Sequence, residues 1–453
     1  MKSTKLEEIV EENNCIGCGF CAVVCPQNAI EMVYDKTRDS FKPEVAPSAD
    51  CNCIIDCLCY DFCPGKNLDL HDLIMNKYGS LPENYLTGHY TDLKIGHSTN
   101  SEIREASSSG GLVPAILAYL FDSNQIDCAY CVVPSKESPY KTSGKIIYST
   151  DELSSIHGSV YHPVNFGKEL KTLFSSKNRF AFVGVPCQIE ALEKYKIINP
   201  GITDYLVLSI GVFCGGYNKF QAFEYYLKEF AIKWKDVKSI SFRHGKWPGQ
   251  IRVEFSNKEN VSVIPRTRGN TRSGILRYAS SVDGFYMLKR CRLCPDPLND
   301  LADVALGDPH LPKFKQKSDH GNSIIVSRNK KAKKIIDDLL GSGALFVEEA
   351  IPNDVILSQG HTLKNRKYLK AYLSINRFLG GKNPVFILDE RAYHPYLSNY
   401  LFAFRDLTKI YFLPPQYFQS FYKLFQIFDY LILSLLKPKK LLLRLSMVIF
   451  KYK

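Results

Sequence analysis

Cysteines crowd the amino-terminal end of this 453-residue sequence, where nine of the 15 lie between Cys15 and Cys63. The first run reads Cys15-Ile-Gly-Cys18-Gly-Phe-Cys21-Ala-Val-Val-Cys25-Pro26. Three thiolates spaced by two residues can hold one iron–sulfur cubane, and the proline after the fourth cysteine directs that cysteine toward a second cluster. Structural zinc sites are the alternative, but they usually pair two C-x2-C units across a longer spacer. The spacing therefore predicts iron–sulfur chemistry.

The second run, Cys51-Asn-Cys53-Ile-Ile-Asp56-Cys57-Leu-Cys59-Tyr-Asp-Phe-Cys63-Pro64, is irregular. A regular spacing counted back from Cys63 would place a ligand at Asp56, which has Cys57 beside it. Either Cys57 or Asp56 completes the cluster, or one iron is labile and the site holds three. We assign the clusters, with Cys51 as the spare, to Cys15, Cys18, Cys21 and Cys63 and to Cys25, Cys53, Cys57 and Cys59. This module resembles a two-cluster ferredoxin domain.

Four later cysteines stand where α/β folds build ligand sites. Cys187 begins an amphipathic helix after a buried strand, where backbone amides and the helix dipole favour a thiolate. Cys214 follows a second strand, and Cys291 and Cys294 form a C-x2-C unit flanked by cations. These four could converge on one cubane, or could be buried thiols or zinc ligands. Cys128 and Cys131 lie on another predicted strand and face opposite sides of it, which predicts core thiols.

Several loops could bind phosphate. The segment Ser107-Ser108-Ser109-Gly110-Gly111 precedes an apolar helical stretch, and a helix amino terminus is a natural anion site. An ordinary helix cap would have the same sequence pattern and is the alternative. The segment Ser241-Phe-Arg243-His244-Gly245-Lys-Trp247 combines cations with an aromatic ring, and Pro265-Arg266-Thr-Arg268 is a second basic loop. Solvated surface loops are the alternative for both.

In this order, the motifs resemble the family of coenzyme F420 hydrogenase/dehydrogenase beta subunits, over residues 1 to about 360. The resemblance rests on the cysteine runs and on Gly158-Ser-Val-Tyr161, Gly184-Val-Pro-Cys187-Gln-Ile-Glu, Gly211-Val-Phe-Cys214-Gly and Gly307-Asp308. It implies FAD beside a third [4Fe-4S] cluster held by Cys187, Cys214, Cys291 and Cys294. The flavin contacts that we expect are Ser109, Gly110, Gly111, Gly158, Tyr161, Arg243, Gly307 and Asp308.

The elements that position these residues predict a multidomain α+β or α/β protein. We expect a ferredoxin-like two-cluster module at 1–66, a mixed α/β flavin and iron–sulfur domain in two parts, 67–180 and 181–360, and a helical tail at 361–453. Hydrophobic residues make up 45% and charged residues 23% of the chain, which excludes wholesale disorder and coiled coil.

Charge is segregated along the chain. Residues 1–65 hold five Lys/Arg and eleven Asp/Glu, a net of −6, which suits a docking surface for a redox partner protein. Residues 401–453 hold nine Lys/Arg and two Asp/Glu, a net of +7, beside apolar blocks shorter than the ~20 residues that span a bilayer. The tail is therefore an interfacial helix on anionic lipid, a docking helix for a partner subunit, or a helix packed on its own core.

The amino terminus lacks the apolar segment of a secretory signal, which predicts a cytoplasmic protein, peripheral on the membrane if the tail binds lipid. No recognised nucleic-acid module is present in the sequence. The expected function is an FAD and iron–sulfur oxidoreductase that exchanges electrons with a small organic acceptor. The alternative is an electron-transfer subunit, without substrate chemistry of its own. The resemblance does not identify the acceptor, because formate dehydrogenase beta subunits and a chlorophyll-derivative reductase share this architecture.

Overall fold

The structure is a computed structural model that describes residues 5–46, 58–156, 158–228, 230–256, 261–264, 286–315, 320–388 and 395–412. Cys51, Cys53, Asp56 and Cys57 of the second cysteine run lie outside the described residues, as does the tail after Phe412. The predictions for those residues stay predictions.

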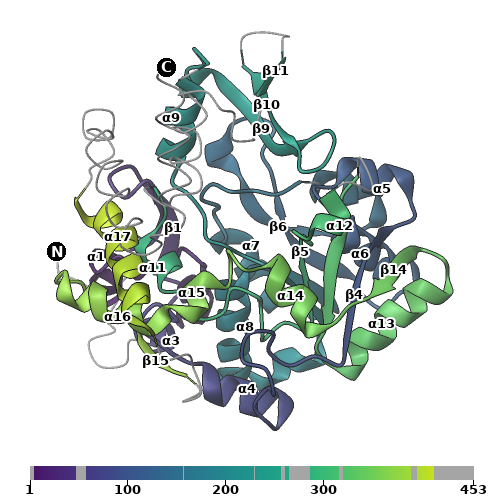
Figure 1. Cartoon of the computed structure of the whole chain (residues 1–453), viewed down its shortest axis with the longest axis horizontal. Coiled ribbons are helices and arrows are strands. Elements are labelled where there is room, and N and C mark those ends of the chain that lie inside the picture. Colours follow the sequence, from purple (N-terminus) through teal and green to yellow (C-terminus); the bar gives the residue numbers. More distant parts are fainter. Residues whose placement is uncertain are drawn as a thin grey trace, which may run out of the picture.

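A mixed eight-stranded sheet, with the order β14-β4-β13-β12-β8-β7-β5-β6, forms the centre of the molecule (Figure 1). Its four inner strands β12, β8, β7 and β5 are parallel, and the outer strands pair antiparallel. Both predicted parts of the flavin and iron–sulfur domain therefore share one sheet. Its strands are β4 (Asp92–Ser98), β5 (Cys128–Val133), β6 (Ser143–Ile147), β7 (Phe180–Gly184), β8 (Leu206–Val212), β12 (Val304–Gly307), β13 (Ser323–Ser327) and β14 (Leu345–Glu349).

Helices cover both faces of this sheet, which is why its inner strands are apolar throughout. On one face lie α6 (Leu112–Asp122) and α13 (Lys330–Gly341), and on the other α7 (Gly167–Ser175) and α8 (Pro186–Ile198). Cys128 packs into one of these two cores and Cys131 into the other. The prediction that both are core thiols facing opposite sides of a strand is confirmed.

The amino-terminal module packs directly against α7 and α8. It consists of α1 (Lys5–Glu11), α2 (Phe20–Val24), β1 (Ile30–Asp35), β2 (Ser40–Val45) and α3 (Leu58–Phe62), followed by β3 (Asn67–Asp69) and α4 (Leu70–Tyr78). Phe20 contacts Phe174 on α7 and Tyr195 on α8, with ring centroids 5.6 and 6.3 Å away. A Cβ on Gly19 would lie 3.1 Å from the Gly167 backbone, so glycine permits the close approach of α2 to α7.

A second small layer stands beside the sheet. It holds the antiparallel strands β9 (Val237–His244), β10 (Gln250–Phe255) and β11 (Val261–Ile264), covered by α9 (Phe220–Lys228). Three short helices complete the central domain: α5 (Ser101–Ala106), α11 (Lys289–Arg292) and α12 (Pro312–Lys315).

The carboxyl-terminal helices fold back onto the amino-terminal side, where α17 packs against α11 and Lys382, after α16, forms an ion pair with Glu12. They are α14 (Pro352–Ser358), α15 (Lys364–Lys367), α16 (Leu369–Phe378) and α17 (Leu397–Phe412), and β15 (Val385–Ile387) pairs in parallel with β3. Leu293, Tyr372 and Leu407 share one core. Residues 397–412 therefore pack on the protein's own core, whereas the apolar blocks on which the tail predictions depend lie outside the described residues. None of the helices in the described ranges is long and apolar enough to span a membrane.

Candidate functional site

The first cysteine set surrounds one hollow at the centre of the amino-terminal module. Cys15, Cys18, Cys21 and Cys63 line one small hollow, together with Gly17 and Gly19 and apolar side chains of α1 and α3. All four thiols are free rather than paired in disulfides. We call these four residues the proximal site. They are the ligands that the sequence assigned to the first cluster.

Backbone geometry explains the residues between these cysteines. Gly17 and Gly19 have φ angles of +69° and +81°, which side chains other than glycine rarely adopt. Backbone N–H groups then reach the sulfurs: Gly65 donates to Cys63 Sγ at 3.3 Å, and the Phe20 amide bonds to Cys18. Amide-to-sulfur bonds of this kind are a main determinant of iron–sulfur reduction potentials.

The proximal thiols destabilise one another when they carry no metal. Burial and the neighbouring Cys15 together raise the pKa of Cys63 to about 11. The same two causes, burial and adjacent thiolates, hold the pKa values of Cys18 and Cys21 far above the usual range. Buried thiols that meet at one point without disulfides fit a metal cluster, which would stabilise the thiolate form.

Two of the four cysteines assigned to the second cluster are described. Cys25 Sγ accepts a hydrogen bond from the Ala29 amide at 3.3 Å. Cys25 and Cys59 both belong to the small apolar core under α1. Cys53 and Cys57 lie outside the described residues, so this ligand set stays a prediction.

The four later cysteines meet at the carboxyl ends of the parallel strands. Cys187 lies in the first turn of α8, directly after β7, and Cys214 follows β8 by two residues. Cys291 lies in α11, and Cys294 follows that helix. We call these four residues the distal site. In open α/β sheets this edge is where ligands bind.

Asn299, which the sequence reasoning missed, holds the distal loops together. Its amide donates to Gly184 O at 3.2 Å and to Val212 O at 2.9 Å, so it joins the ends of β7 and β8. The Cys214 amide also donates to Pro297 O at 3.0 Å. Only the left-handed φ of +58° at Asn299 hints at a special position, and that angle is not visible in a sequence.

Electrostatic interactions connect the two sites. The pKa of Cys187 lies far above its usual range. Burial is the largest cause, followed by the nearby Glu190, Cys214, Cys18 and Cys291 in order of decreasing effect. Three of these neighbours are cysteines of the proximal and distal sites. The Cys187 thiol therefore lies within electrostatic range of both sites.

A buried ion pair flanks the distal site. Glu190 is fully buried one turn after Cys187, and its Oε2 lies 3.7 Å from Arg290 Nη2. No residue in the described part of the chain donates a hydrogen bond to either carboxylate oxygen of Glu190. The sequence reasoning missed this pair, because a glutamate in an amphipathic helix normally faces solvent.

Three of the expected flavin contacts bond directly to one another. Arg243, at the end of β9, donates from Nη1 to Asp308 Oδ2 at 2.8 Å and to the Tyr161 hydroxyl at 3.3 Å. Asp308 follows β12 and stands on the same sheet edge as Cys187 and Cys214. A Cβ on Gly307 would lie 1.9 Å from the Phe213 ring, which accounts for the glycine before Asp308.

The serine and glycine contacts form a second group. The Gly110 amide donates to Ser323 Oγ at 3.0 Å, and a Cβ on Gly110 would lie 2.5 Å from Gly96 O. Ser109 Oγ bonds to the Asn322 carbonyl, and Gly111 caps α6 with φ +74°. These glycines therefore have a packing role, and their contact with a flavin stays a prediction. The loop that holds Gly158 is attached here, since the Ser159 amide donates to Ser108 Oγ at 2.8 Å.

Trp247 and Gly321 connect the two groups. A Cβ on Gly321 would lie 2.7 Å from both Ser109 Cα and Trp247 Cδ1, and the ring centroids of Trp247 and His310 are 6.2 Å apart. Two buried donor groups make no hydrogen bond to any residue that the structure describes: Nε and Nη2 of Arg243, and Nε1 of Trp247. Buried orphan donors are rare in native proteins and fit a site for an acceptor-rich ligand.

Comparison with known families assigns the chain. Residues 94–171 match the amino-terminal model of the family "Coenzyme F420 hydrogenase/dehydrogenase, beta subunit", and residues 177–353 match its carboxyl-terminal model. The chain belongs to this family. Residues 8–31 also match a 4Fe-4S binding domain, which supports [4Fe-4S] chemistry at the first cysteine run. This family is one of oxidoreductases, as its description states.

Several relatives align with more of this chain than the two matched family models cover. One is a component of the F(420)H(2) dehydrogenase of Methanosarcina mazei, 21% identical over 71% of this chain and 81% of its own length. The coenzyme F420-dependent sulfite reductase of Methanocaldococcus jannaschii is 24% identical over 83% of this chain and 52% of its own length. A chain of the F420-reducing [NiFe] hydrogenase complex from Methanosarcina barkeri has a similar fold, with a TM-score of 0.51 at 17% identity, covering 68% of this chain and 98% of that chain.

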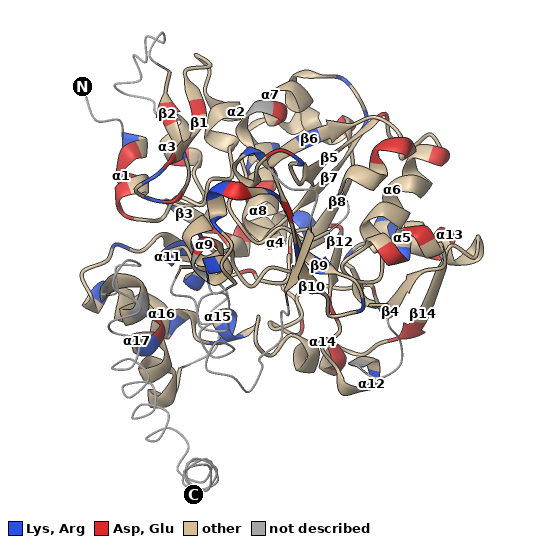
Figure 2. Cartoon of the chain, turned by 90° about the horizontal axis from the view of Figure 1, so that it is seen from above, with Lys and Arg blue, Asp and Glu red and all other residues tan. Residues whose placement is uncertain are grey.

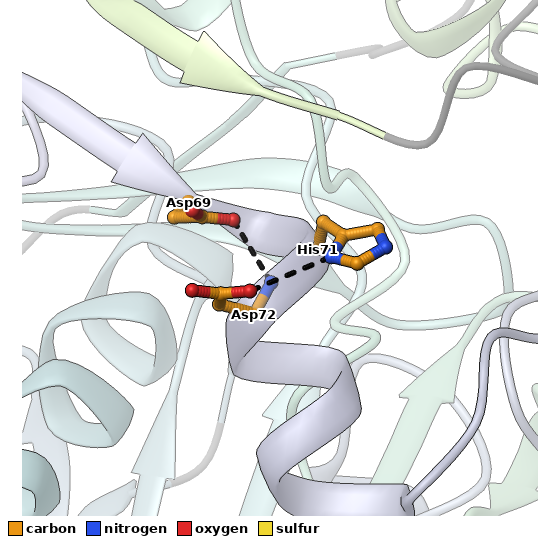
Figure 3. A group of neighbouring side chains, drawn as sticks. All are labelled: Asp69, His71 and Asp72. Carbon is orange, nitrogen blue, oxygen red and sulfur yellow. Dashed lines mark hydrogen bonds and ion pairs between the residues drawn. The ribbon is translucent and has the colours of Figure 1, made fainter.

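One further group of possible metal ligands has a structural explanation. Asp69, His71 and Asp72 lie together at the start of α4 (Figure 3). Asp69 caps the helix by accepting from the Asp72 amide at 2.8 Å, and His71 Nδ1 lies 3.5 Å from Asp72 Oδ1. The first contact is a standard amino-terminal helix cap, so the group needs no metal to account for it.

Proposed function

We propose that this beta-subunit-like protein is an iron–sulfur flavoprotein oxidoreductase that passes electrons between ferredoxin-type clusters and FAD. The electrons leave to, or arrive from, a small organic acceptor, either an F420-like deazaflavin or another molecule. The cofactor set is two clusters in the amino-terminal module, a third at the distal site, and FAD.

The observation that carries this proposal is the way Tyr217 links the two cysteine sites. The Tyr217 backbone amide donates to the Cys291 thiol of the distal site. Its hydroxyl donates to Ile16 O, 3.5 Å away, within the proximal cysteine run. A single half-buried residue thus contacts both ligand loops, and Cys18 and Cys187 interact electrostatically beside it. This proximity supports electron transfer between the two sites.

The residues around Arg243 support a flavin site. When bound, FAD would convert single electrons into the pair that an organic acceptor takes. Asp308 and Tyr161 hold one nitrogen of Arg243, which leaves Nε and Nη2 available for a phosphate or carbonyl oxygen. Trp247 would offer a ring face and an orphan N–H to a planar ligand. Which of these groups contacts the flavin and which contacts the acceptor is the part that experiment must assign.

The acidic amino-terminal module is the proposed docking surface for a redox partner protein. Figure 2 marks acidic residues in red on α1, β1 and β2, at the end of the molecule that carries the proximal site. Complementary charge would speed the encounter with a basic partner and make it sensitive to salt.

Turnover by the isolated protein tests the proposal. The full chain is purified anaerobically, its iron and flavin contents are measured, and the reduced protein is offered a deazaflavin, nicotinamides and quinones in turn. Oxidation of the protein by one of these acceptors, without any partner, is the expected result. A preparation that holds neither flavin nor a distal cluster would overturn the proposal.

A second candidate function is an electron-transfer subunit, without substrate chemistry of its own. The relative from Methanosarcina mazei is named as one of the subunits of a dehydrogenase, and the similar structure is a chain of a hydrogenase complex. In that case the reduced protein would pass electrons to a partner protein and to none of the small acceptors. The acceptor screen therefore separates the two candidates.

A further inference from the structure

The hairpin turn between β1 and β2 places Arg38 inside the molecule. Asp35 Oδ1 accepts hydrogen bonds from the amides of Thr37 at 2.8 Å and Arg38 at 3.1 Å, which closes the turn. Arg38 is only 8% exposed, although it lies in a turn of a short hairpin. The turn therefore buries a side chain that is almost always solvated elsewhere.

All the hydrogen-bond acceptors of the Arg38 guanidinium are neutral. Nη1 donates to Val10 O at 2.7 Å, Nε donates to Ser40 Oγ at 2.9 Å, and Nη2 donates to the carbonyl of Cys15. The adjacent Asp39 is engaged elsewhere, since it accepts from the Tyr34 hydroxyl and from the Gln221 amide. No carboxylate among the described residues forms an ion pair with Arg38. A buried cation without a counter-charge is strongly destabilising, so an anion must compensate it.

Arg38 lies against the chain segment that connects the two cysteine sites. It bonds directly to the backbone carbonyl of Cys15, a proximal cysteine. The next carbonyl along the chain, Ile16 O, accepts a hydrogen bond from the Tyr217 hydroxyl at 3.5 Å, and the Tyr217 amide bonds to the Cys291 thiol of the distal site. One buried cation is therefore connected to both ligand loops through neighbouring groups.

We propose that Arg38 is the shared counter-charge of the proximal and distal clusters and raises the reduction potential of both. This inference rests on the proposed function, because it requires a cluster at each site. A cluster bound by four thiolates is anionic, and reduction adds one more negative charge. A nearby buried cation favours the reduced form, because Coulomb interactions are strong where water is excluded. Net charge around a cluster is an established determinant of its potential.

The test compares charge with hydrogen bonding at position 38. Arg38→Gln removes the charge and keeps a donor, whereas Arg38→Lys keeps the charge and loses the three-way hydrogen bonding. Lys333→Gln, an exposed lysine on α13, is the control for loss of one positive charge. Each full-length protein is purified anaerobically, its iron is counted, and its clusters are titrated by electron paramagnetic resonance at controlled potentials.

The expected result is a coordinated shift. In Arg38→Gln both cluster signals should titrate at more negative potentials. At a given potential the ratio of reduced to oxidised cluster should fall about tenfold, which corresponds to a shift of about 59 mV for one electron. Arg38→Lys and Lys333→Gln should titrate close to the parent. Unchanged potentials in Arg38→Gln, or a shift of the proximal signal alone, would overturn the inference.

Loss of iron from the Arg38 variants would also test the inference. If Arg38→Gln binds less iron while Arg38→Lys keeps the full content and the parent potentials, the charge itself is required and the inference holds. If both variants lose iron, the hydrogen bonds and not the charge are what matter, and the inference fails. The parent protein shows which of the two proposals has failed. If the parent has no distal signal, the proposed function is refuted. If the parent has both signals and Arg38→Gln does not shift them, only the role of Arg38 is refuted.

Discussion

Arg292, between the two cysteines of the distal C-x2-C unit, lies 3.7 Å from the carboxylate of Asp406 on α17. Asp406 also bonds Lys364 at 2.8 Å and the Tyr372 hydroxyl at 2.6 Å, and is itself almost completely buried. Asn365 adds a hydrogen bond to the Cys291 carbonyl at 3.1 Å. The helices at 364–412 therefore hold the distal cysteine loop from outside, a role that the sequence did not predict for this region.

Replacing Asp406 should loosen the distal site. Asp406→Asn leaves the buried Arg292 and the half-buried Lys364 without their shared anion, and breaking a buried pair typically costs about 3–5 kcal/mol. We expect a lower urea midpoint and loss of the distal cluster signal, with the proximal signal retained. Asp337→Asn, an exposed carboxylate on α13, is the control. Retention of the distal signal in Asp406→Asn would contradict this view.

The same carboxylate predicts a dependence on pH. Burial raises the pKa of Asp406, but Arg292, Lys364 and Arg405 lower it more, so its net pKa lies well below the usual value. A carboxylate with a depressed pKa contributes stability above its unfolded pKa of about 3.9 and loses that contribution as the pH falls through the folded value. The stability difference between parent and Asp406→Asn should therefore be constant above about pH 5 and shrink below it, as measured by urea unfolding in iron-free protein.

Iron content tests the three-cluster assignment. Anaerobically purified protein should hold about twelve irons if three cubanes form. Serine at any one of Cys187, Cys214, Cys291 and Cys294 should remove the same spectroscopic signal and leave about eight irons. Cys131→Ser, at a core thiol away from both sites, should keep all the iron. Four different spectroscopic phenotypes would show that these cysteines do not share a cluster.

The ligand that completes the second cluster can be found by substitution. If Cys57 has replaced the standard ligand beside Asp56, Cys57→Ser should lose one cluster, whereas Cys51→Ser should keep its full iron content. Iron analysis and resonance spectra of the two variants distinguish them. Full iron in Cys57→Ser would transfer the assignment to Asp56 or Cys51.

Flavin affinity should depend on Arg243. Loss of one hydrogen bond from a charged group weakens binding by about 1.5–3 kcal/mol, so Arg243→Gln should bind FAD roughly 10- to 150-fold more weakly, as measured by flavin fluorescence. Arg179→Gln, an exposed arginine paired with Asp127, is the control. Gly110→Asp is a poor probe here, because any Cβ at Gly110 would collide with Gly96. Unchanged flavin affinity in Arg243→Gln would place the flavin elsewhere.

The basic tail should attach the protein reversibly to anionic membranes. Each Lys or Arg near such a surface contributes about 1 kcal/mol, and the apolar blocks add a second signal. Full-length protein should sediment with anionic liposomes at low salt and be released near 1 M salt, where the Debye length is about 3 Å. The truncation that tests this is placed after Phe412, because α17 packs under the distal site. Equal sedimentation of the truncated protein would exclude the tail as the anchor.

Local patterns were enough for the elements that present the ligands. Cys187 begins α8 and Cys214 follows β8, as their flanking residues predict, because apolar runs and turn residues act within a few positions of the chain. Family membership was also predicted from ordered motifs and agrees with the matches over residues 94–171 and 177–353.

The sequence by itself determined what kind of chemistry the protein can hold, because a C-x2-C-x2-C spacing and strand-end cysteines are short-range features. Only the tertiary structure decided which distant groups meet. The bond from Arg38 to the Cys15 carbonyl, the reach of Asn299 to two strand ends, and the contact between Asp406 and Arg292 all join separate segments. Each of these side chains is polar and buried, and a sequence pattern places such residues on the surface by default. Their burial becomes favourable only when the partner segments fold around them and satisfy their hydrogen bonds and charges.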